Sequence, residues 1–183
     1  MPGAVYLRGD TLTLRTIEEE DLPFLRDTIN DPAVRRFLPN RTPITLDQER
    51  EYYETEICTE ANVQLLVCAN GDRAGTIGLH PADAVSGSAE IGLFLAREHW
   101  GSGLGTEASR ILTEFAFTER RLHRVCARVL GDNVGSRRIW EKLSFRHEAT
   151  LREAAFIDGE YVDVHWYAVL EDEWDTASTH RSE

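Results

Sequence analysis

Cysteine is scarce in this sequence, and its few residues form no pattern. Cys58, Cys68 and Cys126 are odd in number, widely spaced and free of any Cys-x-x-Cys pair. This spacing argues against a disulfide framework and against a zinc site, and it predicts three small buried side chains. The histidines are likewise scattered without metal-ligand spacing, so we expect no bound metal.

Long apolar runs are also missing. No run approaches the roughly 20 residues of a membrane helix. The first residues, Met-Pro-Gly-Ala-Val, lack the basic and apolar regions of a signal peptide. We therefore expect a cytoplasmic protein that does not act at a membrane.

Basic residues are outnumbered, with 20 Lys and Arg against 32 Asp and Glu, and Lys142 is the only lysine. The formal net charge of -12 repels nucleic-acid phosphate and anionic lipid, so neither is an expected partner. A cationic substrate, such as an amine acceptor, would be attracted. Solubility alone is the other explanation of such a charge.

The rest of the composition is that of an ordinary globular protein. Hydrophobic residues make up 42% and charged residues 28% of the 183 positions, which suits one domain with its own core. No linker, repeat or low-complexity segment divides the chain. We predict a single domain over residues 1–183, with an acidic tail at residues 171–183 that frays.

The first half of the chain predicts a sheet with two acidic helices. Alternating residues within 5–17 indicate two short strand pieces joined by a turn. A helix is expected after Thr16, and a second one over residues 46–57 with Thr45 as its N-cap. Consecutive antiparallel strands should follow at residues 63–69, 74–79 and 89–96.

The second half predicts a strand-helix-strand unit and a hairpin. A helix over residues 103–120 follows the strand at 89–96, and a strand over 122–130 should lie parallel to that strand. A shorter helix is expected over residues 133–143. Two strands, residues 145–157 and 161–170, should pair about Asp158-Gly159.

A glycine-rich loop connects the strand at 89–96 with its helix. Gly101, Gly103 and Gly105 let successive backbone N–H groups turn toward one point, and a helix start adds unpaired N–H groups and a positive dipole end. The Gly-Lys-Ser/Thr of a Walker loop occurs nowhere, so the backbone itself would hold an anion. The loop predicts a pyrophosphate-bearing ligand without a catalytic metal, and a purely geometric tight turn is the alternative.

Three phrases in the second half are more specific: Ala-Glu-Ile-Gly-Leu, Trp-Gly-Ser-Gly-Leu-Gly-Thr-Glu-Ala and Asn-Val-Gly-Ser-Arg-Arg-Ile-Trp-Glu-Lys-Leu-Ser-Phe. With them, the series from Ala89 to Leu170 resembles the GNAT family of acyl-CoA-dependent N-acetyltransferases, particularly its RimJ/RimL-like branch. The opening Leu-Thr-Leu-Arg-Thr-Ile-Glu-Glu-Glu-Asp also looks like the first strand and helix of that family.

The resemblance implies an α/β (α+β) fold of GNAT type and acetyl-CoA as cosubstrate. The implied sheet is mixed, mostly antiparallel, of about seven strands, splayed between strands 4 and 5, with helices on both faces. The backbone of Leu93, Phe94 and Leu95 would pair with the pantetheine arm like an added strand. Asn133 and Ser136 would lie near the cofactor, and the pyrophosphate would be cradled by Gly101, Ser102, Gly103, Leu104, Gly105 and Thr106.

Acetyl transfer to an amine needs a deprotonated nucleophile, a stabilised carbonyl oxygen and protonation of the departing thiolate. A backbone N–H near Leu93 to Leu95 could polarise the carbonyl. Glu90 is the leading general-base candidate, directly or through water, and a hydrogen-bonded strand carboxylate is the alternative. Asp163 is a second candidate, as a base or as a residue that binds the amine. His165, on the last strand, is a candidate for lining the acceptor pocket.

Ser136 is the candidate for assisting the leaving thiolate, because its hydroxyl can donate a proton or a hydrogen bond. A helix-start serine that bonds its own backbone is the alternative. Many members of the family place a tyrosine acid where this chain has Trp140, whose indole N–H is no proton donor of comparable acidity. The acid role therefore shifts to Ser136 or to water.

The predicted function is N-acetyl transfer to a primary amine. The RimJ/RimL-like resemblance favours a protein N-terminal α-amine, and a small cationic amine such as a polyamine or aminoglycoside also suits an acidic cleft. Members of the family often pair as dimers, so a homodimer is a further possibility.

Two other classes compete with this function. A dinucleotide-binding oxidoreductase would use Asp132 on a ribose, but Thr106 stands where the third glycine of its motif belongs. A non-catalytic acyl-CoA-binding sensor would bind the cofactor without amine-dependent thiol release.

Overall fold

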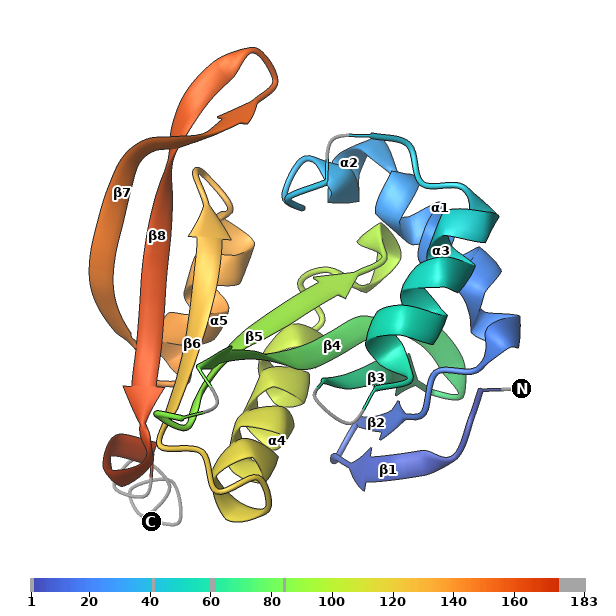
Figure 1. The fold of residues 1–183 in the computed structure, drawn as a ribbon, viewed down its shortest axis with the longest axis horizontal. Coiled ribbons are helices and arrows are strands. Elements are labelled where there is room, and N and C mark those ends of the chain that lie inside the picture. The colour runs from blue at the N-terminus through green and yellow to red at the C-terminus, as the bar shows by residue number, and fades with distance from the viewer. Residues whose placement is uncertain (1, 41, 60–61, 84, 175–183) are drawn as a thin grey trace.

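A computed structural model describes residues 2–40, 42–59, 62–83 and 85–174. They form one eight-stranded sheet in the order β1-β2-β3-β4-β5-β6-β8-β7 (Figure 1). Neighbouring strands are antiparallel, except β5 and β6, which are parallel. The strands are β1 (Val5–Arg8), β2 (Leu12–Arg15), β3 (Val63–Ala69), β4 (Asp72–Asp83), β5 (Ser88–Leu95), β6 (Arg124–Leu130), β7 (Arg146–Ile157) and β8 (Glu160–Leu170).

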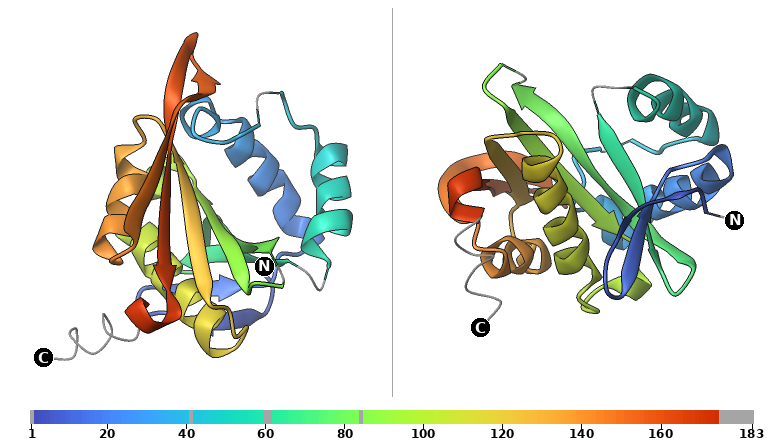
Figure 2. Two further views of the ribbon diagram at one scale, coloured as in Figure 1. Left: turned by 60° about the vertical axis from the view of Figure 1, so that its left-hand side comes forward. Right: turned by 90° about the horizontal axis from the view of Figure 1, so that it is seen from below.

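Helices cover both faces of the sheet (Figure 2). They are α1 (Leu22–Asn30), α2 (Pro32–Arg35), α3 (Leu46–Tyr52), α4 (Leu104–Thr118) and α5 (Val134–Lys142). Helix α3 continues as a π-helical turn, Tyr53–Ile57, and short 3-10 turns precede α1 and α4 at Glu19–Asp21 and Arg97–His99.

Two hydrophobic clusters hold these helices to the sheet. The larger packs α4 and α5 against one face and contains Leu112 and Val129, each no more than 1% exposed. The smaller packs α1 and α3 against the other face, around Leu25 and Leu66. Burial of apolar surface in these clusters is the main force that fixes the helices in place.

Local sequence signals explain where two helices begin. The hydroxyl of Thr45 accepts a hydrogen bond from the backbone N–H of Gln48, and the Gln48 side chain accepts one from the N–H of Thr45, a capping box that starts α3. The side chain of Asn133 caps α5 in the same manner, by accepting from the N–H of Ser136. Both starts agree with the sequence prediction.

The predicted GNAT-like mixed sheet with helices on both faces is confirmed. It has eight strands instead of about seven, because the two pieces within residues 5–17 form separate strands. The predicted splay between strands 4 and 5 therefore falls between β5 and β6.

Two predictions about packing need correction. Cys68 and Cys126 are buried, but Cys58 is exposed at the end of the π-helical turn. Residues 171–174 are helical and not frayed, because Trp174 is only 3% exposed and its indole N–H donates to Glu114 at 2.6 Å. Residues 175–183, the rest of the predicted tail, lie outside the described residues.

Candidate active site

The sheet opens between β5 and β6 (Figure 1). Only Ser88 to Glu90 of β5 pair with β6, against Arg124 to Cys126. Among the described strands, the stretch from Ile91 to Leu95 pairs with β4 alone, so its other edge has no strand beside it. An extended ligand can add to such an edge through main-chain hydrogen bonds, and the edge fits a pantetheine arm.

Glu90 is the last residue of β5 that pairs with β6, so it stands where the two strands part. Its carboxylate accepts a hydrogen bond from Nε of Arg128 at 2.7 Å, and its side chain is 25% exposed. His80 lies directly opposite on β4. The carboxylate is thus partly buried and ion-paired, and its role as a base stays a prediction.

Cys126 lies beside Glu90 but is unsuited to nucleophilic chemistry. Its Sγ is 3.5 Å from the carbonyl oxygen of Ala89. Burial raises the pKa of the thiol, and the negative charge of Glu90 raises it further. Since the thiolate is the reactive form, this cysteine acts as a packing residue.

The glycine loop leaves its backbone open to a ligand. Gly101 and Gly103 have φ angles of 73° and 89°, and a Cβ at either position would meet nothing within 4 Å. Gly103 is also the N-cap of α4, so no side chain satisfies the first N–H groups of this 15-residue helix. The Ser102 hydroxyl donates to the carbonyl of His99 at 2.6 Å and so helps to hold the loop. Unsatisfied N–H groups beside open space fit a diphosphate.

Gly105 and Trp100 serve the packing around this loop. A Cβ at Gly105 would come within 2.8 Å of Ile139 Cδ1 and 3.2 Å of Leu93 Cδ2, so glycine lets α4 approach α5 and β5 closely. The indole N–H of Trp100 donates to the carbonyl of Leu95 at 2.9 Å. This bond occupies one of the backbone groups assigned to the pantetheine arm.

Helix α5 presents Ser136 at its first turn. The Asn133 side-chain oxygen caps the helix at 3.1 Å from the Ser136 nitrogen. The indole Nε1 of Trp140 donates to Oγ of Ser136 at 3.2 Å, and the ring packs against Phe145 with centroids 5.0 Å apart. The Ser136 hydroxyl oxygen is therefore held by its own helix. The roles of Asn133 and Ser136 toward the cofactor stay predictions.

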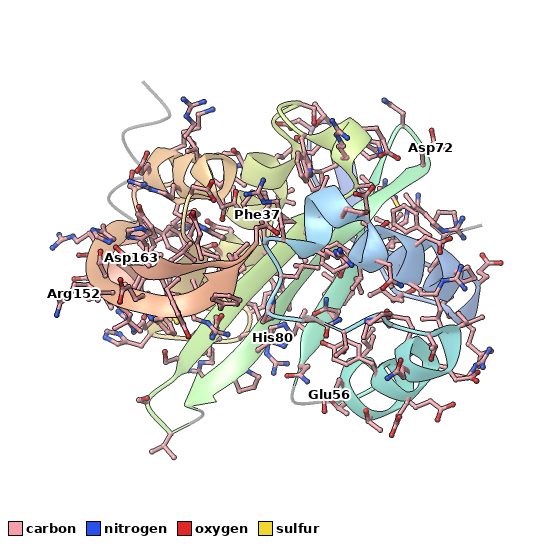
Figure 3. All side chains as sticks on the ribbon, turned by 90° about the horizontal axis from the view of Figure 1, so that it is seen from above. Phe37, Glu56, Asp72, His80, Arg152 and Asp163 are labelled. Atoms are coloured by element: carbon pink, nitrogen blue, oxygen red, sulfur yellow. The ribbon has the colours of Figure 1, made fainter. Side chains whose placement is uncertain are left out.

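Asp163 and His165 do not share the surroundings of Glu90. Asp163 accepts a hydrogen bond from the backbone N–H of Glu153 at 2.9 Å, across an irregularity between β7 and β8. Figure 3 shows Asp163 and Arg152 together on this hairpin, apart from His80 on β4. Neighbouring residues of a strand point to opposite faces of the sheet. His165 lies opposite the core residue Val129 and therefore on the face that α5 covers. Glu90 and Arg128 lie on the other face.

His165 belongs to a small polar cluster on this face. Its Nδ1 lies 3.1 Å from Oγ1 of Thr150 and 3.3 Å from Nε2 of His147. Burial lowers the pKa of His165, and the positive charges of Arg137 and His147 lower it further. The predicted contacts of Asp163 and His165 with an acceptor stay predictions.

The sequence analysis missed Arg128 and His80, the two neighbours of Glu90 that the register supplies. The alternation Arg124, Cys126, Arg128 along β6 was the available signal, because it puts basic residues on the face opposite the apolar Val125, Ala127 and Val129. Their pairing with Glu90 needed the register of β5 against β6.

The described residues contain neither a cluster of metal ligands nor a membrane-spanning helix. In residues 2–40, 42–59, 62–83 and 85–174, no group of three or more His, Cys, Asp or Glu side chains could hold a metal ion. No helix among them is long and apolar enough to span a bilayer.

A splayed mixed sheet and an uncapped helix start beside open glycines fit the acyl-CoA-dependent acyl transfer that the sequence resemblance implies. The family model described as an acetyltransferase (GNAT) domain matches residues 11–146. The chain belongs to the GNAT family of acetyltransferases.

Known relatives agree with this assignment. The uncharacterized N-acetyltransferase p20 of Bacillus licheniformis is 33% identical over 92% of this chain and 97% of its own. The putative ribosomal N-acetyltransferase YdaF of Bacillus subtilis (strain 168) is 30% identical, covering 91% and 95%. The solved spermidine N-acetyltransferase of Vibrio cholerae, in complex with CoA and spermine, has a TM-score of 0.84 and 26% identity, covering 91% of this chain and 99% of its own.

The chain is thus an acyl-CoA-dependent N-acetyltransferase that uses acetyl-CoA as its cosubstrate. This assignment argues against the dinucleotide-binding oxidoreductase that the sequence left open. The names of these relatives point to different acceptors, since one is called a ribosomal and another a spermidine acetyltransferase, so the acceptor is the subject of the proposals that follow.

Proposed function

We propose that this chain moves the acetyl group of acetyl-CoA to the α-amine of a protein N-terminus, as a RimJ/RimL-like enzyme. Glu90 is the general base, directly or through water, and Ser136 assists the leaving thiolate. The observation that carries the proposed chemistry is the position of Glu90 at the last paired residue before β5 and β6 part. The choice of acceptor is supported by the 30% identity to a putative ribosomal N-acetyltransferase. A reacting amine that enters the split from the face of Arg128 and Trp166 meets this carboxylate first.

The bond changes require both residues. The amine nitrogen forms a bond to the acetyl carbon, and the bond from that carbon to sulfur breaks. Glu90 takes the proton that the amine loses. The Ser136 hydroxyl donates a hydrogen bond to the departing sulfur, which takes up a proton from solvent. A backbone N–H of Leu93 to Leu95 polarises the acetyl carbonyl.

The backbone supplies most of the cosubstrate site in this proposal. The free edge of β5 at Leu93 pairs with the pantetheine arm, whereas the Phe94 carbonyl faces Gly75 of β4. The N–H groups around Gly101 and Gly103, with the uncapped start of α4, hold the pyrophosphate. Neither contact needs a basic side chain.

A small cationic amine is the second candidate acceptor. It is favoured by the formal charge of -12 and by the spermidine N(1)-acetyltransferase of Escherichia coli (strain K12), which is 26% identical over 82% of this chain. The proposed base and cosubstrate residues are the same for both acceptors.

The test is thiol release from acetyl-CoA with peptides of different N-termini, spermidine and spermine, and an amine-free blank. Release with peptides alone, with the acetyl group on the α-amine by mass spectrometry, is the expected result. Release with the polyamines alone would move the assignment to the second candidate.

Two variants test the residue roles. Glu90→Gln should lower kcat/KM by about 100-fold with little change in CoA affinity. Glu148→Gln is the matched control, because Glu148 on β7 forms a similar ion pair with Arg124, which lies where β6 is still paired with β5 and not where the strands part. Equal losses in the two variants would remove Glu90 from the proposed mechanism.

A further inference from the structure

Arg128 is held on the open side of the split by two contacts. Its Nε donates to Glu90 at 2.7 Å, and its Cζ lies 5.6 Å from the centroid of the Trp166 ring. The two contacts fix the guanidinium plane, yet the side chain remains 48% exposed. It is a preorganised cation at the surface.

Its outer nitrogens are available to a ligand. Within residues 2–40, 42–59, 62–83 and 85–174, no side chain or backbone oxygen accepts a hydrogen bond from Nη1 or Nη2 of Arg128. Arg124 lies four residues earlier on β6 and on the same face. Its outer nitrogens are occupied, because Nη1 and Nη2 donate to Glu148 at 2.8 and 2.6 Å. Both outer nitrogens of Arg124 are bonded to Glu148, whereas both outer nitrogens of Arg128 remain within reach of solvent.

The chemistry of these donors selects an anion. A guanidinium presents paired N–H groups in one plane, a geometry that matches the two oxygens of a carboxylate. The proposed base is bonded to the same guanidinium, so an anion on the outer nitrogens would lie next to an amine on Glu90. Both groups would then belong to one acceptor molecule.

We propose that the acceptor is a primary amine that carries a carboxylate close to the amine, on the same carbon or through one or two methylene groups. Glu90 receives the amine and Arg128 binds the carboxylate. This inference rests on the proposed function of Glu90 and names the acceptor class for that site. Arg128 is thereby a specificity-determining residue.

The local charge works against the second candidate acceptor. A polyamine brings a further ammonium group toward the guanidinium, and like charges at close range repel. The overall charge of -12 attracts polyamines from a distance, where salt screens it beyond a Debye length. The guanidinium of Arg128 therefore determines which acceptor binds at the site, while the net charge of the protein affects only the rate at which an acceptor reaches it.

The carboxylate has two sources with the same chemistry. It is the α-carboxylate of a free amino acid, or the side chain of an aspartate or glutamate at the first position of a peptide. Peptide acceptors that differ only in Asp or Asn at the first position isolate the second source. A free amino acid and its α-carboxamide isolate the first.

The experiment measures kcat/KM for these matched acceptors with the whole chain, with Arg128→Gln and with Arg128→Lys. The unchanged protein should prefer the carboxylate of one pair by at least about 10-fold, as expected for a charge-assisted bidentate contact. Arg128→Gln should remove the preference through KM, and Arg128→Lys should restore part of it. Arg124→Gln is the control that should keep the preference.

Each other outcome overturns the inference. Equal use of both members of both pairs, unchanged in Arg128→Gln, would remove Arg128 from acceptor recognition and leave the proposed function intact. Exclusive use of polyamines would overturn this inference together with the peptide acceptor. Loss of activity toward every acceptor in Arg128→Lys, with normal folding by circular dichroism, would assign Arg128 to supporting Glu90 and not to selecting a carboxylate.

Discussion

The indole N–H of Trp140 donates a hydrogen bond to the hydroxyl oxygen of Ser136, 3.2 Å away and one helical turn earlier on α5. Trp140 is only 3% exposed and packs against Phe145. Since the serine oxygen already accepts from the indole, its own proton must point to a different acceptor. Trp140 therefore orients the Ser136 hydroxyl.

Ser136→Ala should lower kcat by about 10- to 100-fold, because the leaving thiolate loses its donor. Trp140→Phe keeps an aromatic ring but removes the N–H donor and part of the ring volume; loss of the hydrogen bond to Ser136 should lower kcat by about 3-fold, the worth of one neutral hydrogen bond. The double variant should match Ser136→Ala, since the indole acts through the serine. Steady-state kinetics on the three proteins gives the comparison. Independent, multiplying losses would show that Trp140 acts by another route.

Gly103→Ala should weaken CoA binding by about 10-fold or more. Its φ of 89° is costly for alanine, so the backbone would shift away from the geometry that collects N–H groups. Gly159→Ala is a matched control with the same φ of 89° and the same open surroundings, but at the β7–β8 turn. Both should lose about 1 kcal/mol of stability, and only Gly103→Ala should lose CoA affinity by calorimetry. Equal CoA affinity in the two variants would contradict the pyrophosphate cradle.

The elements around this loop could be predicted because their signals are local. The glycines of the loop, the acidic first turns and the caps Thr45 and Asn133 act within a few residues, so they show in the sequence. The hairpin about Asp158-Gly159 was equally local.

The pairing of side chains across strands could not be predicted in the same way. Glu90 meets Arg128 only because three residues at the start of β5 pair in parallel with β6, and a shift of one residue would turn Arg128 to the other face. The register of β6 against β8 likewise places His165 on the face opposite Glu90. The burial of Trp174 also depends on contacts far along the chain, with Glu114 and Phe117.

Arg73→Met should destabilise the fold by about 3 kcal/mol. The carboxylate of Asp21 is 0% exposed, and it accepts from Nε of Arg73 at 2.6 Å. Without the guanidinium, a buried charge loses its partner, which is the costly way to break an ion pair. Urea unfolding followed by circular dichroism measures the loss.

The control for this prediction is Arg50→Met, which breaks a pair with Asp47, whose side chain is 94% exposed. It should cost less than about 1 kcal/mol. If Asp21→Asn in the Arg73→Met background restores no stability, the loss comes from packing of the arginine stem and not from the stranded carboxylate.

His165 should make the fold less stable in mildly acidic solution. Burial, followed by the charges of Arg137 and His147, lowers its pKa in the folded chain, so the unfolded chain binds the proton more readily. The contribution is fully present above the unfolded pKa of about 6.5 and is lost as the pH falls from there toward the lower folded value. Thermal unfolding at pH 7.5 and at pH 5.5 should therefore show a smaller drop in Tm for His165→Gln than for the unchanged protein. His123→Gln, at an exposed histidine before β6, should keep the full drop. If His165→Gln loses as much stability on acidification as the unchanged protein, the acid sensitivity arises elsewhere in the chain.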